Sequence, residues 1–332
     1  MKILVATRDD IFAIDPLEGL MERAMGLGDR RPTCLAADRW VAGRAWSGTA
    51  GAGVLRSDDE GVSWRPAGLD GEEVTAVTAS PTERDVVWAG TEPSAVYRSL
   101  DAGVTWERSE GLLDLPSSSE WSFPPRPETH HVRWIAPHPA DSGRLWVAIE
   151  AGALLTTFDG GKTWRDRVPA GPYDTHELAV HADRPDALRV AAGDGYFESE
   201  DGGETWSSPE RGLEVDYLRS VAIVPGDPEV VVVSAASHAY AAYMAGKSDG
   251  RIYRRAGRGA AWERVLDGWP DPPATIAPLL AVGQTPGELW AADERGVHRS
   301  GDGGRSWERV AAFPATPPWL RGIAITSDGR LY

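Results

Sequence analysis

Residues 199–206 read SEDGGETW, and this octapeptide recurs along the chain. The clearest further copies are SDDEGVSW at 57–64, SLDAGVTW at 99–106, TFDGGKTW at 157–164 and SGDGGRSW at 300–307, while RAGRGAAW at 255–262 keeps only a glycine and the tryptophan. The shared pattern is Ser/Thr-x-Asp-x-Gly-x-Ser/Thr-Trp. Self-similarity of this kind indicates a fold built from repeated structural units.

The spacing of the octapeptides gives the number of units. Asp59 and Asp101 are 42 residues apart, as are Asp159 and Asp201, and two longer intervals each fit one unit plus an insertion. Asp15, in the segment FAIDPLEGL, takes the same position in a further unit, which the chain after the last octapeptide completes. Seven units result, one of them split between the two ends of the chain.

Each unit reads as four short strands, and units of about 42 residues with four strands are typical of β-propeller blades. We therefore predict one all-β domain over 1–332, a seven-bladed β-propeller with one blade completed by strands from both termini. The shared blade is expected over 1–30 and 317–332. The other blades are expected over about 31–70, 71–112, 130–168, 172–210, 215–268 and 273–313.

The 15 tryptophans fit this architecture, because large aromatic side chains pack well between neighbouring sheets. Six are the last residues of the octapeptides. We expect four others to recur on the second strands of their blades, namely Trp40, Trp88, Trp146 and Trp290.

Composition narrows the classes of partner. The chain has 34 Lys and Arg against 50 Asp and Glu, a formal net charge of −16. Nucleic acids and anionic membrane surfaces attract basic proteins, so we expect neither as a partner. The apolar run in MKILVATRDD is shorter than that of a signal peptide, which favours a cytoplasmic location.

Through its octapeptides, the chain resembles the Asp-box (BNR) repeat family of β-propellers, which includes sialidases, xyloglucanases, sortilin-type receptors and a photosystem II assembly factor. The resemblance covers nearly the whole chain and implies glycosyl-hydrolase-like chemistry or a binding role. A sialidase in the strict sense is not expected. The family's N-terminal Arg-Ile-Pro motif is absent, since the corresponding stretch reads ATRDD with Arg8 alone, and no Tyr–Glu nucleophile pair can be matched.

Three arginines take the same place in their units. Arg133, Arg219 and Arg321 are each the second residue at the start of a first strand, the innermost strand of a blade, so we expect them near the mouth of the central channel. Guanidinium groups bind carboxylate and phosphate through two parallel hydrogen bonds. The alternative is internal pairing with acids such as Glu177. The predicted ligand-binding residues are Arg8, Arg133, Arg219, Tyr240, Trp319 and Arg321.

The two insertions, 112–131 and 234–250, fall on the face opposite the octapeptide turns, where long connections are typical of binding loops or lids. Connections on this face also carry several histidines and acids. Such groups act as general acids and bases, and together they bind divalent metals. The predicted catalytic residues are Glu150, His176, Glu177 and Asp194. Under the metal hypothesis, the ligands are His130, His131, His176 and His238.

Three functions therefore stand side by side. The first is the binding of a small anionic or carbohydrate-like ligand in a central pocket, with glycosyl-hydrolase-like or lyase-like chemistry. The second is a non-catalytic scaffold that binds a protein partner. The third is a divalent-metal-dependent enzyme that uses a His/Glu/Asp cluster from the fourth to sixth blades. The residues identify neither the substrate nor the reaction.

Overall fold

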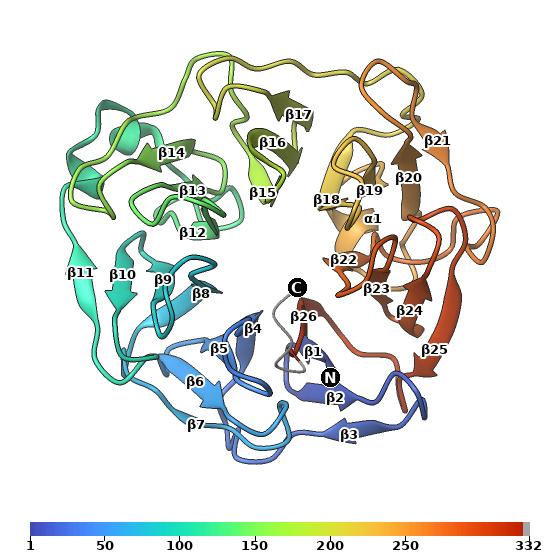
Figure 1. Ribbon diagram of the computed structural model, residues 1–332, viewed down its shortest axis with the longest axis horizontal. Coiled ribbons are helices and arrows are strands. Elements are labelled where there is room, and N and C mark those ends of the chain that lie inside the picture. The colour runs from blue at the N-terminus through green and yellow to red at the C-terminus, as the bar shows by residue number, and fades with distance from the viewer. Residues whose placement is uncertain (328–332) are drawn as a thin grey trace.

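The computed structural model describes residues 1–327, which form seven β-sheets arranged in a ring (Figure 1). Paired strands are antiparallel, and each sheet runs from a strand at the centre of the ring to a strand at its periphery (Figure 1). The predicted all-β, seven-bladed β-propeller is confirmed.

The first blade is closed by both ends of the chain, as predicted. Its strand order is β26 (Leu320–Ile325), β1 (Ile3–Thr7), β2 (Ile11–Ile14) and β3 (Met21–Arg23), and Ile3 lies opposite Ile325. Because β26 hydrogen-bonds to β1, strands from the two ends of the chain belong to one sheet, and this pairing closes the ring. Residues 328–332, part of the predicted range of this blade, lie outside the described residues.

The other blades follow in chain order around the ring. The second and third are β4 (Pro32–Ala37), β5 (Ala45–Thr49), β6 (Val54–Ser57) and β7 (Arg65–Pro66), then β8 (Glu73–Ala79), β9 (Val87–Glu92), β10 (Val96–Ser99) and β11 (Glu107–Ser109). The fourth and fifth are β12 (Val132–Pro137), β13 (Leu145–Ile149) and β14 (Ala153–Thr157), then β15 (Thr175–His181), β16 (Arg184–Ala192) and β17 (Gly195–Ser199). The sixth and seventh are β18 (Tyr217–Ile223), β19 (Val231–Ala236), β20 (Arg251–Arg255) and β21 (Glu263–Arg264), then β22 (Leu279–Val282), β23 (Leu289–Asp293), β24 (Gly296–Ser300) and β25 (Glu308–Ala312).

The fourth and fifth blades differ from the expected four strands. Their outermost segment is reduced to one bridge pair each, Thr156 with Arg165 and Glu198 with Ser207. In the fifth blade Pro209 follows two residues later and has no N–H to extend the ladder. In the fourth blade the next residue, Asp166, instead accepts hydrogen bonds from the backbone N–H and hydroxyl of Ser117.

The octapeptides form the turns between third and fourth strands, and their polar residues hold those turns. In 157–164 the Oδ1 of Asp159 accepts from the Thr157 hydroxyl at 2.9 Å and from the Thr163 N–H at 2.9 Å, and its Oδ2 accepts from the Thr163 hydroxyl at 2.6 Å. Gly161 adopts a φ of 82°, which favours glycine, and its N–H donates to the Thr157 hydroxyl. The other four intact copies repeat this pattern.

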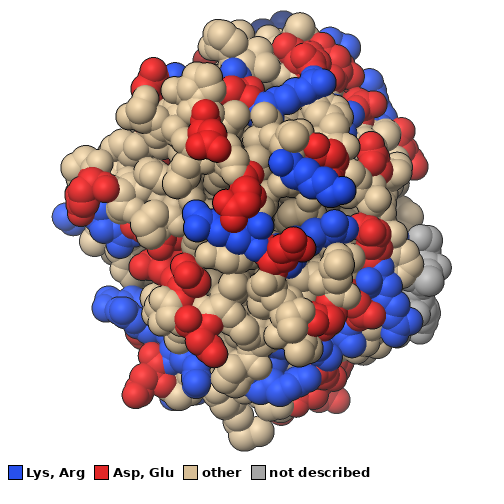
Figure 2. Space-filling model, turned by 90° about the vertical axis from the view of Figure 1, so that its left-hand side faces the viewer, with Lys and Arg blue, Asp and Glu red and all other residues tan. Residues whose placement is uncertain are grey.

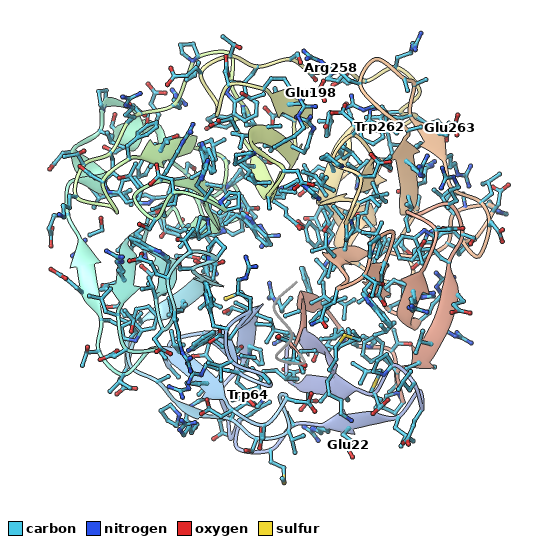
Figure 3. The ribbon with its side chains drawn as sticks, in the orientation of Figure 1. Glu22, Trp64, Glu198, Arg258, Trp262 and Glu263 are labelled. Carbon is cyan, nitrogen blue, oxygen red and sulfur yellow. The ribbon has the colours of Figure 1, made fainter. Side chains whose placement is uncertain are left out.

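Tryptophans pack the blades against one another. Trp64, in the second blade, joins Leu4 and Ile11 of the first blade in one apolar cluster, and Figure 3 places its side chain toward the outer part of the ring. On the second strands the buried series is Trp46, Trp88, Trp146 and Trp290. The expectation for Trp40 is wrong. It lies in the turn before β5, where its indole N–H donates to the backbone oxygen of Ser80.

The degenerate sixth octapeptide is held differently. Arg255 stands where the other copies have a hydroxyl, and its guanidinium donates to Glu198 and to the Tyr196 hydroxyl in the fifth blade. The ring of Trp262 lies 5.0 Å from this guanidinium. Figure 3 shows Glu198 and Trp262 on facing sides of the two blades. A buried ion pair therefore replaces the aspartate-centred turn.

Both insertions carry short helices. The first contains the 3-10 helices η1 (Leu112–Asp114) and η2 (Pro116–Glu120) and packs at the outer part of the fourth blade, with Trp121 buried (Figure 1). The second contains α1 (Ala239–Tyr243), which lies near the centre of the ring beside β18 (Figure 1). Of the two insertions, the second therefore places its helix at the centre of the ring.

Charges of both signs alternate on the side of the ring that Figure 2 shows, without a continuous basic area. Within the described residues, no helix has the length and apolar character needed to cross a membrane.

Candidate functional site

The candidate site is built by the starts of innermost strands, together with one turn and one helix. Strands β12, β15, β18 and β26 bring in the predicted arginines and acids, and the turn after β13 brings in Glu150. Because side chains two apart on a strand point to the same face, Asp174, just before β15, and His176 share one side of the chain. Helix α1 adds Tyr243 from the sixth blade.

Arg219 is used by the protein itself. Its side chain is buried, and its two terminal nitrogens donate to the backbone oxygens of Ala242, Ala277 and Leu320 at 3.3, 2.7 and 2.8 Å. The guanidinium also lies 4.5 Å from the ring of Tyr243. Burial lowers the pKa of Arg219 to about 10. The charges of Arg133 and Arg321 act in the same direction, whereas Tyr243 opposes the shift.

The other two predicted arginines are less fully engaged. The Nε of Arg133 lies 3.3 Å from Glu150, and its guanidinium also hydrogen-bonds Tyr243. Arg321 is exposed and lies 5.3 Å from the ring of Trp319. Among residues 1–327, no carboxylate lies within ion-pair distance of Arg321. Desolvation, followed by the charge of Arg133, lowers its pKa.

The acids beside these arginines differ in protonation. Burial raises the pKa of Glu177 to about 8, although the Ser220 hydroxyl donates to it at 2.5 Å and Arg133 lies nearby. Burial would also raise the pKa of Glu150, but the hydrogen bond from His131 at 2.8 Å and the charge of Arg133 lower it to about 2. At neutral pH Glu150 is therefore ionised, while Glu177 keeps its proton for much of the time.

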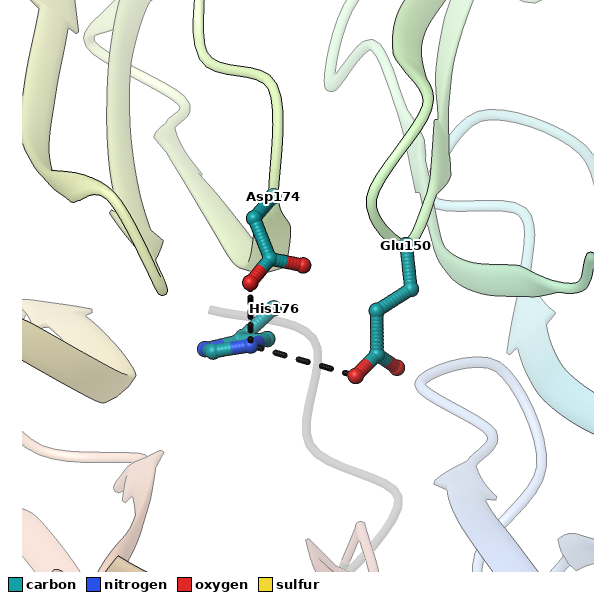
Figure 4. A group of neighbouring side chains, drawn as sticks. All are labelled: Glu150, Asp174 and His176. Atoms are coloured by element: carbon teal, nitrogen blue, oxygen red, sulfur yellow. Dashed lines mark ion pairs between the residues drawn. The ribbon is translucent and has the colours of Figure 1, made fainter. Parts of the chain in front are cut away.

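His176 lies at the meeting point of the fourth, fifth and sixth blades (Figure 4). Its Nδ1 donates to the backbone oxygen of Leu218 at 2.5 Å, so the other nitrogen, Nε2, faces Asp174 at 3.7 Å and Glu150 at 4.0 Å. The hydroxyl of Tyr217 lies 3.4 Å from the same nitrogen. Burial raises the pKa of Asp174, while the charge of His176 opposes the shift.

Some predicted residues have other roles. Asp194 accepts from the backbone N–H groups of Tyr173 and Asp174, so it holds the loop that carries Asp174. His238 accepts from Ala241 N–H as the N-cap of α1, and His130 accepts from Ser94 N–H. His131 contacts the candidate site through its hydrogen bond to Glu150.

The remaining predicted ligand-binding residues lie at the rim. Tyr240 is 68% exposed, and its ring contacts His238 rather than the arginines and acids of the candidate site. Trp319 stacks on Tyr243 with ring centroids 6.4 Å apart. Arg8 donates its backbone N–H to Trp319, and its side chain is half exposed beside Asp9.

Sequence reasoning missed three side chains of the site, Asp174, Tyr217 and Tyr243. Asp174 carried a usable signal, because it stands two residues before His176 at the start of a strand, and such a pair shares one face. Tyr217 likewise starts an innermost strand, two residues before Arg219. No signal in the sequence places Tyr243 in the site, because its position depends on a helix inside an irregular insertion.

No protein-family model and no curated protein sequence matches the chain. Its structure is similar to an ancestral GH74 enzyme, with a TM-score of 0.65 and 16% identity over 83% of this chain and 38% of that chain. It is also similar to the GH74 xyloglucanase from Xanthomonas campestris, with a TM-score of 0.65 and 16% identity over 98% of this chain and 54% of that chain. A structure of YCF48 bound to D1 peptide gives a TM-score of 0.58 and 20% identity, over 83% and 82% of the two chains.

These likenesses establish the β-propeller fold alone. The chain spans about half or less of the GH74 enzymes that it resembles, and most of YCF48. Hydrolases and a peptide-binding protein share this scaffold, so function has to be argued from the side chains at the centre of the ring.

Proposed function

We propose that this Asp-box β-propeller binds a small anionic or sugar-like ligand at the centre of the ring, on the face that carries α1. The observation that carries the proposal is Arg321. It stands in a group of like charges with Arg133, Arg219 and Arg8, and within the described part of the chain no carboxylate lies within ion-pair distance of it, although the charge of Glu73 acts on it from farther away. A protein of net charge −16 has many acids available for such pairing.

An anion bound between Arg321 and Arg133 would relieve this repulsion. The Nε of Arg133 faces Glu150 and one guanidinium hydrogen bond goes to Tyr243, so the remaining N–H groups of its terminal nitrogens are the donors for a ligand. Guanidinium groups match carboxylate and phosphate in geometry, and a hydrogen bond to a charged group contributes about 1.5–3 kcal/mol. Tyr243 and Trp319, stacked on each other, would form an aromatic wall beside the anion.

The experiment is a thermal-shift and calorimetric screen of anions against the wild type, R321Q and R309Q. The probes are inorganic phosphate, citrate, glucuronate, glucose 6-phosphate and, as the neutral control, glucose. Arg309 is an exposed residue on the outer strand β25, so R309Q makes the same charge change far from the centre. We expect at least one anion to bind the wild type and R309Q, and to bind R321Q about 10-fold or more weakly.

A peptide with a free carboxyl terminus, compared with its amidated form, tests whether the anion belongs to a protein partner. YCF48, which shares the fold, is seen with a bound peptide. Preference for the free carboxylate over every sugar anion would favour the scaffold. Binding that R321Q and R309Q weaken equally would contradict the proposed site.

Glycosyl-hydrolase-like or lyase-like catalysis is the second candidate, favoured by the carboxyl groups beside the arginines. Glycosidases use one protonated carboxyl group as an acid and one ionised carboxylate as a nucleophile or base. Glu177 and Glu150 flank Arg133 and could take these roles. Turnover of a ligand found in the screen, lost in E177Q while its affinity is retained, would support catalysis. Binding without turnover in the wild type would contradict it.

A further inference from the structure

Three side chains at the centre of the ring each turn one ligand-type atom toward a common point. These atoms are the Oε1 of Glu150, the Oδ2 of Asp174 and the Nε2 of His176, and all lie within 4.8 Å of one another (Figure 4). His176 is 1% exposed, while the two carboxylates reach partly to solvent. The two carboxylates are therefore more accessible to solvent than the histidine.

The second polar atom of each residue is already fixed by a neighbour. The Oε2 of Glu150 accepts from His131 at 2.8 Å, and the Oδ1 of Asp174 accepts from the backbone N–H of Ala151 at 3.0 Å. The Nδ1 of His176 donates to the backbone oxygen of Leu218. Outer contacts of this type orient metal ligands in proteins and set the tautomer of a ligating histidine.

The three converging atoms face one another without being joined by hydrogen bonds. Because Nδ1 is engaged by Leu218, Nε2 is the nitrogen of His176 that faces the two carboxylates. The distances of 3.7 and 4.0 Å from Nε2 to Asp174 and Glu150 are too long for direct hydrogen bonds. The hydroxyl of Tyr217, at 3.4 Å, supplies at best one weak donor, and Arg133 contacts the opposite oxygen of Glu150.

We propose that Glu150, Asp174 and His176 form a binding site for a divalent first-row transition metal such as Zn²⁺ or Mn²⁺. Atoms at these separations leave room for one ion at about 2.1–2.5 Å from each, close to metal–nitrogen and metal–oxygen bond lengths. One imidazole and two carboxylates favour such ions over Mg²⁺, which prefers an all-oxygen shell. Three protein ligands leave coordination positions for water or an anion.

This site differs from the one expected from the histidines alone. Of His130, His131, His176 and His238, only His176 presents a nitrogen to it, and the other two ligands are acids. The inference does not depend on the anion proposal, because none of the three ligands is Arg321. R321Q is expected to keep the metal.

The test is calorimetric titration of the chelator-treated, desalted wild type with ZnCl₂, MnCl₂ and, for comparison, MgCl₂. The variants are D174N and E150Q, which remove one ligand charge each and keep the shape of the side chain. The matched control is D183N, because Asp183 and His181 form a similar acid–histidine contact, with 3.7 Å between them, beyond the other end of β15. Thermal melting with chelator present reports whether each variant is folded.

We expect one equivalent of Zn²⁺ or Mn²⁺ to bind the wild type and D183N, and the affinity of D174N and E150Q to fall at least about 10-fold. If either ligand variant does not fold, pulsed electron paramagnetic resonance of Mn²⁺-loaded wild type replaces it, and coupling to one nitrogen is expected from His176. The inference is overturned if neither metal binds with one equivalent, if D174N and E150Q bind like the wild type, or if no nitrogen coupling appears.

Discussion

The guanidinium of Arg219 donates a hydrogen bond to the backbone oxygen of Leu320, 2.8 Å away, although the two residues are 101 positions apart. This bond joins the sixth blade to the first, near the seam where the two ends of the chain meet. The neighbouring side chain, Arg321, is left without an acid partner within 1–327. Arg219 thus stabilises the closed ring, whereas Arg321 is available to a ligand.

R219M is predicted to destabilise the ring. Methionine fills similar space but donates no hydrogen bonds, so the carbonyls of Ala242, Ala277 and Leu320 lose a buried partner. We expect the free energy of unfolding to fall by about 2–4 kcal/mol, measured by urea denaturation. R309M, on the exposed face of β25, is the control and should change it by less than about 0.5 kcal/mol. Equal stability of R219M and the wild type would contradict this role.

R321Q is predicted to have the opposite effect on the ligand-free protein. The substitution removes a charge that makes no ion pair with the described residues, and for which desolvation and repulsion by Arg133 and Arg8 outweigh the attraction of Tyr243 and Glu73. Stability in low salt should therefore be unchanged or slightly raised, and the difference should shrink as salt screens the repulsion. Urea denaturation in 20 mM and 300 mM NaCl measures both. A marked loss of stability would mean that Arg321 is paired within the protein.

The octapeptide aspartates predict a specific loss of stability in acid. These aspartates accept hydrogen bonds from hydroxyls and backbone N–H groups, which lower the pKa of four of them to about 2. At Asp101, Asp201 and Asp302 the hydrogen bonds outweigh desolvation, and at Asp159 there is little desolvation to oppose them. The unfolded value is about 3.9, so the stabilisation is complete above that pH and is lost as the pH falls through about 2. D201N should melt below the wild type at pH 6, and the gap should narrow toward pH 2. A gap independent of pH would contradict the prediction.

The ion pair that replaces the sixth octapeptide turn predicts strong coupling between its members. R255M would leave the buried carboxylate of Glu198 without its main partner, since Arg189 lies 3.9 Å away. Breaking a buried pair costs about 3–5 kcal/mol, whereas replacing both members by apolar residues can be nearly neutral. R255M/E198M should therefore recover much of the stability that R255M loses. Additive losses in urea denaturation would argue against a coupled pair.

The fold followed from the sequence because the octapeptide is a local device. Asp159, Gly161 and Thr163 bond within one turn, so their spacing survives in the sequence wherever a blade recurs. The strand-closed seam could be predicted as well, since the partial units at the two ends sum to one blade. Trp40 shows the limit of such reading, because Trp46, six residues on, fits the same pattern and occupies the strand.

The site was only partly predictable because it depends on contacts between blades. The first-strand position placed Arg133, Arg219 and Arg321 near one another, but nothing in their spacing tells that backbone carbonyls occupy Arg219. For a similar reason, the sequence pattern assigns too many histidines to a single metal site. His130 and His238 are engaged by nearby backbone N–H groups, and such hydrogen bonds have no sequence signature.

The measurement that tests the central claim most directly is a crystal structure of the protein with the best-binding anion from the screen. We predict that its carboxylate or phosphate oxygens lie within hydrogen-bond distance of the guanidinium groups of Arg321 and Arg133. An anion bound only elsewhere, with the side chain of Arg321 paired to an acid of the protein, would contradict the claim that the centre of this propeller is an anion-binding site.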